Sequence, residues 1–230
     1  MRKAIVVIAM ICLGLSGLSA AQSDSVTPRV RVWMPPVQVS PQDPLVRIPV
    51  YLANPFDTIA GVELNLEIED NPFIEFVLDE INEEGLEMAV DTSGTLLGSW
   101  EWVGLNFSEP DFSRMKVAAM ADWPDGTITP PLAPQDSTLL MSLVCHNYNI
   151  HPLTGTVEIH IAIQPEHTGF SDNMGRTIGV TTTIEKECER YVADSCVSWK
   201  NRRVGRLDTT IVKMVDGVIS IVDSLPPSHE

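Results

Sequence analysis

Apolar and polar residues alternate along much of this chain. In residues 58–70, TIAGVELNLEIED, every second residue from Val62 to Ile68 is apolar and the residues between them are polar. A period of two predicts a β-strand with one buried face and one solvated face. Three glutamates, Glu63, Glu67 and Glu69, lie on the solvated face beside Asn65, which raises the question of whether this face binds a partner.

Other short stretches have similar strand patterns, with turn signals such as NPFD, DNPF and WPDGT between them. We expect two closing strands around an Asp216–Gly217 turn, and a loop with some helical character at residues 82–94. The remaining predicted strands are residues 28–34, 45–54, 74–81, 99–108, 114–123, 137–150 and 153–164. Many short strands without a long helix predict an all-β fold, an antiparallel β-sandwich of jelly-roll type.

The predicted organisation is one domain between two short terminal segments. Residues 1–21 have the pattern of a signal peptide: Arg2 and Lys3, an apolar run, then small residues that favour cleavage after Ala20 or Ala21. The apolar run is too short for a comfortable membrane span. We therefore expect residues 22–223 to form one secreted bacterial domain, periplasmic, at the cell surface or in the medium. Residues 165–210 are expected to be an irregular polar excursion, and 224–230 a short tail.

The charge of the chain limits its partners. The formal net charge is −16, from 15 Lys and Arg against 31 Asp and Glu. A nucleic-acid surface needs basic patches for phosphates, so this composition argues against one. The negative charge is typical of a well-solvated surface, or of a surface that binds cations or basic partners.

Three cysteines remain after the predicted cleavage. Export permits a disulfide, and we favour Cys188 with Cys196, which lie eight residues apart in a polar segment. Cys145 lies in the apolar run LLMSLVC and is expected to be a buried thiol.

No catalytic motif is present, so we do not expect an enzyme. The five histidines have no short-range partner of a known motif, and the chain has no G-x-S-x-G, H-E-x-x-H or glycine-rich phosphate loop. No cofactor is expected, although calcium stays open. Its oxygen ligands would come from Asp122 and Asp125 beside Gly126, or from Asp70 and Asn71, all of which also favour turns.

The tryptophans leave a carbohydrate-binding function open as the alternative. Trp100 and Trp102 are two residues apart and would share a strand face, as a sugar-stacking platform or as core residues. Trp123, beside Pro124 in a predicted loop, is the better exposed candidate. Such a module would act in polysaccharide degradation or cell-surface attachment.

Three stretches follow one another in a recognisable order: a turn at residues 41–43, a strand at 46–50 and a loop at Thr58–Gly61. They resemble the turn, the V-x-V-P-V strand and the G-I-A-G loop of the cohesin family. Residues 114–123, 137–145 and 215–221 resemble later cohesin strands. The chain differs from a bare cohesin by its 165–210 segment, its cysteine pair and the absence of tandem copies.

The resemblance implies a non-catalytic module that recruits a dockerin-type protein partner through one sheet face. Carried over residue by residue, Gly61, Glu63, Asn65 and Glu67 fall on that face. A rigid strand can present carboxylates to the Lys and Arg of a partner and thereby set its register. The same residues also fit a merely solvated strand face, and both interpretations stay open.

Overall fold

The computed structural model describes residues 27–77, 80–82, 85–87, 89–107, 112–122, 129–148, 156–193 and 195–222. The predicted signal peptide, the predicted tail and Trp123 lie outside these residues. The described part consists almost entirely of strands, which confirms the all-β prediction. It contains no helix long and apolar enough to cross a membrane.

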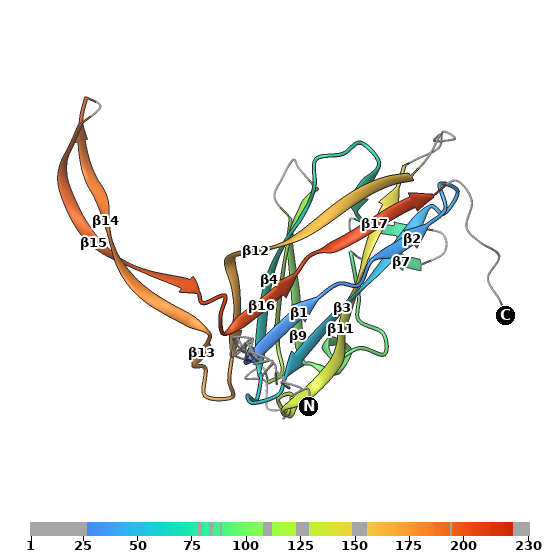
Figure 1. The fold of residues 1–230 in the computed structure, drawn as a ribbon, viewed down its shortest axis with the longest axis horizontal. Coiled ribbons are helices and arrows are strands. Elements are labelled where there is room, and N and C mark those ends of the chain that lie inside the picture. The colour runs from blue at the N-terminus through green and yellow to red at the C-terminus, as the bar shows by residue number, and fades with distance from the viewer. Residues whose placement is uncertain are drawn as a thin grey trace, which may run out of the picture.

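The first layer of the sandwich is a six-stranded sheet (Figure 1). Its main path runs in the order β16 (Val212–Val215), β1 (Val30–Trp33), β3 (Leu45–Asn54), β11 (Gln135–Asn147) and β5 (Ile74–Phe76). β8 (Val90–Asp91) pairs with β11 off this path, and β1 and β16 pair in parallel.

The second layer is a seven-stranded sheet. Its main path runs in the order β2 (Val37–Val39), β17 (Gly217–Val222), β12 (Thr156–Ser171), β4 (Gly61–Ile68), β10 (Arg114–Met120) and β9 (Trp102–Phe107). β13 (Thr177–Ile178) pairs with β12 off this path, and β2 and β17 pair in parallel. β4, the strand predicted within residues 58–70, therefore lies inside this sheet between β12 and β10.

The core lies between the two sheets, where their apolar faces meet. Leu64 and Leu66 of β4 are fully buried, as are Ile48 and Leu52 of β3 in the opposite sheet. The alternation predicted this arrangement because successive side chains of a strand point to opposite faces. Burying a leucine of this kind stabilises the fold by roughly 1.5–3 kcal/mol.

Two local predictions were wrong. Asp216 and Gly217 do not form a hairpin turn, because β16 belongs to the six-stranded sheet and β17 to the seven-stranded sheet. The dipeptide instead carries the chain from one layer to the other. Residues 82–94 contain no α-helix among those described; β6 (Glu80–Asn82) and β7 (Gly85–Glu87) pair as a small ladder, and a 3₁₀ turn follows at Leu97–Ser99.

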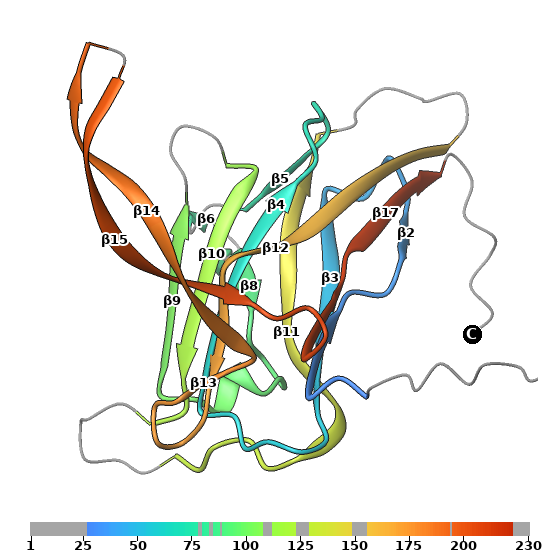
Figure 2. The same cartoon turned by 60° about the vertical axis from the view of Figure 1, so that its left-hand side comes forward.

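The excursion predicted at 165–210 is regular. Its first residues extend β12, and β14 (Val180–Val192) and β15 (Ser195–Leu207) form one antiparallel ladder that projects from the sandwich (Figures 1 and 2). We call residues 180–207 the arm. Its polar composition suggested a loop, but a two-stranded ribbon is solvated on both faces and needs little apolar alternation.

Candidate partner-binding face

β4 places the predicted partner-binding residues on the outward face of the seven-stranded sheet. Glu63, Asn65 and Glu67 alternate with buried residues and are half-buried, whereas Gly61 is buried at the start of the strand. β10 flanks β4 on one side and β12 on the other. The structure thus brings the four residues to one strand, with side chains of two neighbouring strands around them.

Both carboxylates on β4 have a cationic neighbour on β10. Glu63 forms an ion pair with Lys116, and Glu67 accepts a hydrogen bond from Arg114 at 2.6 Å. Gln164 of β12 donates a further bond to Glu67 at 2.8 Å. The outward face therefore has mixed charge around β4, since cations of the adjacent strand offset its glutamates.

Arg114 and Lys116 were not among the site residues predicted from the sequence. Their alternation with the buried Met115 and Val117 placed them on the polar side of a strand. Alternation alone does not reveal which strands become neighbours, so the pairing with β4 was not predictable from this signal.

Asn65 holds an irregular part of β12. The Asn65 backbone N–H donates to the Thr168 hydroxyl at 3.1 Å, and its side-chain amide donates to the Glu166 carbonyl at 3.2 Å. The β4–β12 register shifts between Gln164 and Gly169, where His167 has a φ of 61°. Asn65 is therefore a structural residue of this bulge as well as a candidate contact.

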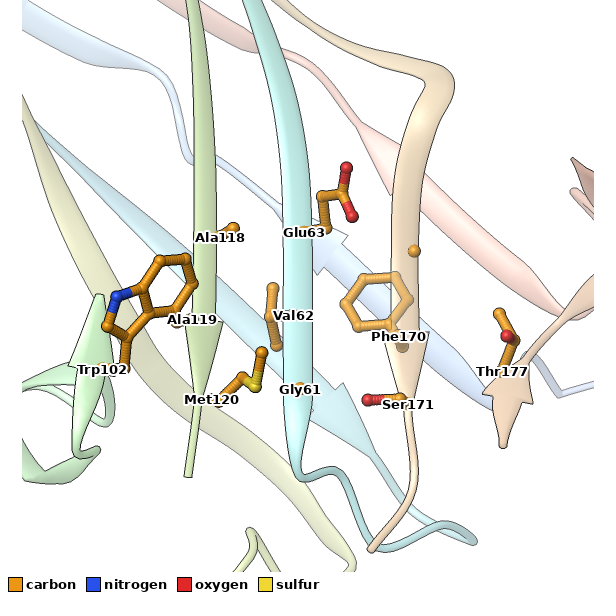
Figure 3. A pocket seen from close by; sticks show the side chains of 11 residues that line it. Gly61, Val62, Glu63, Trp102, Ala118, Ala119, Met120, Phe170, Ser171 and Thr177 are labelled. Carbon is orange, nitrogen blue, oxygen red and sulfur yellow. The ribbon is translucent and has the colours of Figure 1, made fainter. Parts of the chain in front are cut away.

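A shallow depression of about 240 Å³ lies beside Glu63 on this face. Trp102 and Met120 line its β9 and β10 side, and Ser171 lines its β12 side (Figure 3). A Cβ at Gly61 would overlap the Ser171 side chain, so glycine keeps the two strand ends close here. The depression has an apolar floor of a size that suits one side chain of a partner.

The turn after Ser171 is fixed by Asp172. The carboxylate accepts the backbone N–H of Arg176 at 2.9 Å and the Arg176 guanidinium at 2.7 Å. The backbone hydrogen bond, with help from the guanidinium, lowers the pKa of Asp172. Asp172 thus anchors the connection to β13 at the edge of the depression.

Trp100 and Trp102 do not form the paired platform of the carbohydrate alternative. Trp100 precedes β9 and is buried in the core, whereas Trp102 is half-buried at the depression. Trp199, on the arm, is 59% exposed, and Trp33 stacks on Tyr51 with ring centroids 5.4 Å apart. Among the tryptophans that the structure describes, the most exposed is Trp199, which is not one of the three favoured from the sequence.

Asn71, one of the possible calcium ligands, acts as a turn residue. Its side-chain oxygen accepts the backbone N–H groups of Phe73 and Ile74 at 2.9 and 2.7 Å. Asp125 and Gly126 lie outside the described residues. Across the described ranges, no group of three or more His, Cys, Asp and Glu residues is placed to hold a metal ion.

The cysteines have the arrangement that the sequence analysis favours. Cys188 and Cys196 form a disulfide across the arm, with Cα atoms 5.8 Å apart. Cys145 is a free thiol in the core, where burial raises its pKa.

Two curled sheets with this strand pattern define a cohesin-like β-sandwich. The chain is similar to a type III cohesin module from the cellulosomal ScaE cell-surface anchoring scaffoldin of Ruminococcus flavefaciens. That similarity has a TM-score of 0.51 and 10% identity, and covers 87% of this chain and 91% of that one. At this identity the likeness establishes the fold alone.

Further similar structures have lower TM-scores. A type I cohesin–dockerin complex from Clostridium thermocellum gives 0.47 at 13% identity, covering 87% of this chain and 98% of that one. A non-cellulosomal cohesin from the hyperthermophilic archaeon Archaeoglobus fulgidus gives 0.43 at 13% identity, covering 84% and 91%. No protein-family model matches the sequence. No curated protein matches it either.

Proposed function

We propose that this protein is a secreted, non-catalytic binding module that takes a dockerin-like protein partner on the outward face of β4. The observation that carries the proposal is the cohesin-like sandwich with β4 inside an accessible sheet face. The side chains of Glu63 and Glu67 remain 42% and 30% exposed despite their ion pairs. Secretion is inferred from the signal-peptide pattern of residues 1–21.

The ion pairs give this face a defined pattern of charge. Lys116 and Arg114 hold the carboxylates of Glu63 and Glu67 in place, so a partner meets pre-positioned charges. A partner with both basic and acidic side chains would match this pattern, and the match would set its register more than its affinity. The depression beside Glu63 would accept one apolar side chain of that partner.

Charge reversal at Glu63 tests the site. Glu63→Lys places a second cation beside Lys116, so we expect about tenfold or weaker binding to the partner. Glu75→Lys is the matched control, because Glu75 is an exposed strand residue of the other sheet. Both variants and the unmodified protein would be used as bait for secreted dockerin-bearing proteins of the same source. Unchanged capture by Glu63→Lys would show that the site is assigned to the wrong face.

A further inference from the structure

The arm carries apolar side chains that its own two strands cannot bury. Each strand has 13 residues, which corresponds to a length of about 40 Å. Ile184 is 68% exposed, Trp199 59% and Tyr191 66%. A single two-stranded ribbon has no second layer to cover such residues and is marginally stable by itself in water. The arm therefore presents the kind of surface that marks an interaction site.

The two faces of the arm differ in chemistry. One face is ion-paired within itself: Glu187 lies 3.5 Å from both Lys200 and Arg202, and Glu185 lies 2.6 Å from Arg206. The cross-strand pairs Ile184–Arg203, Lys186–Asn201 and Cys188–Trp199 point to the other face. We call Ile184, Lys186, Trp199 and Arg203 the open face.

The open face is apolar and cationic. Neither Lys186 nor Arg203 has an ion-pair partner among the residues that the structure describes. Residues 180–207 hold six of the 15 Lys and Arg but four of the 31 Asp and Glu, so a cationic arm projects from a strongly acidic chain. A partner for this face has to supply carboxylates around an apolar contact.

The sandwich supplies carboxylates of this kind. Glu69 and Asp70 follow β4, and Glu158 lies on the adjacent β12; all three are exposed. Glu69 accepts the backbone N–H of His160 at 3.3 Å, which places it next to β12. None of the three is in an ion pair within the described ranges. We call these three residues the acidic patch.

We propose that the arm mediates self-association, with its open face docked on the acidic patch of a second copy of this chain. Charge complementarity favours this occupant, because the same chain provides both the cationic ribbon and the acidic patch. Contact between two open faces would bring Lys186 and Arg203 against their own copies and would be repulsive. The arm points away from its own sandwich (Figures 1 and 2), so the patch it meets is on another molecule.

The disulfide restricts the conformations of the arm before it docks. It ties Cys188 to Cys196 close to the tip, where the ladder has register shifts. A cross-link there reduces the conformational freedom that binding would otherwise have to remove. The exposed Trp199 is paired with Cys188 in the ladder and so occupies a fixed position on the open face.

Sedimentation of the full chain at increasing concentration tests the proposal. We expect a dimer or larger assembly at concentrations up to the order of 100 μM, weakened by about 0.5 M NaCl, which screens charges beyond a few ångströms. Arg203→Glu and Trp199→Ala should each raise the dissociation constant about tenfold or more. Arg202→Glu is the control, because it makes the same charge change on the ion-paired face. It should leave association unchanged.

A charge swap identifies the docking surface. Glu158→Lys should weaken association as Arg203→Glu does, and an equimolar mixture of the two variants should regain it, because each then supplies the charge that the other lacks. Thermal unfolding of each variant checks that the sandwich stays folded. A chain that stays monomeric throughout would overturn the proposal, as would equal effects of Arg202→Glu and Arg203→Glu. These outcomes are independent of dockerin capture, so they leave the proposed function separately testable.

Discussion

At the scale of single residues, the cysteines are in opposite environments. Cys145 is fully buried between the sheets, and desolvation there disfavours the thiolate, which raises its pKa. Cys188 and Cys196 are cross-linked on the projecting arm. Because the thiolate is the reactive form, the folded protein has no readily modified thiol among the cysteines that the structure describes.

Thiol titration of the chain from residue 22 checks both features. With a thiol reagent, we expect almost no reaction under native conditions, one thiol in denaturant and three after reduction. Cys145→Ala is the control and should remove the single thiol seen in denaturant without changing the number that reduction releases. Three thiols in denaturant without reductant would contradict the disulfide, and fast native labelling would contradict the burial of Cys145.

At the scale of elements, the arm departs from the sandwich at Gly179. This residue lies between β13 and β14 with a φ of +69°, and a Cβ there would overlap the side chain of the fully buried Val212. Gly175, in the preceding turn, has a φ of +72°, but a Cβ at that position would have open space within 4 Å. The two glycines share a left-handed backbone and differ in the space around them.

Alanine substitution separates these two effects. Gly175→Ala should cost about 1–2 kcal/mol of unfolding free energy, the usual penalty for a left-handed non-glycine residue. Gly179→Ala should cost roughly 1–3 kcal/mol more, because Val212 has to move within a packed core. Urea denaturation of both variants measures the difference. Equal losses would show that Val212 does not constrain the arm junction.

The same scale shows which parts of the structure were predictable. The alternation from Val62 to Ile68 defined the buried side of β4, because a half-buried strand needs an apolar face. Pairing between strands was not predictable, since it depends on segments far apart in sequence; Lys116 beside Glu63 is the example that matters for the site. Asp216–Gly217 looked like a hairpin turn for the same reason, because only the pairing shows that its flanking strands are in different sheets.

At the scale of the whole molecule, the arm and the sandwich are joined by few contacts. Apart from the pairing of β14 with β15, the main contacts of the arm with the sandwich are between β15 and β12. Val180 and Leu207 pair at the base, and Leu207 packs against the core. Most of the arm therefore contributes little to the burial that holds the two sheets together.

Shortening the arm tests this division. Replacing residues 182–205 with Asn-Gly joins the paired residues Thr181 and Arg206 through a two-residue hairpin turn and keeps the base intact. At a dilute protein concentration, we expect the unfolding free energy to change by less than about 1 kcal/mol, because the core is untouched. Leu64→Ala, in the core, is the reference and should lose about 2–5 kcal/mol. A loss in the shortened chain as large as that of Leu64→Ala would mean that the arm is part of the cooperative folding unit. With the sandwich intact, the shortened chain should also be monomeric, since the open face is gone while the acidic patch remains.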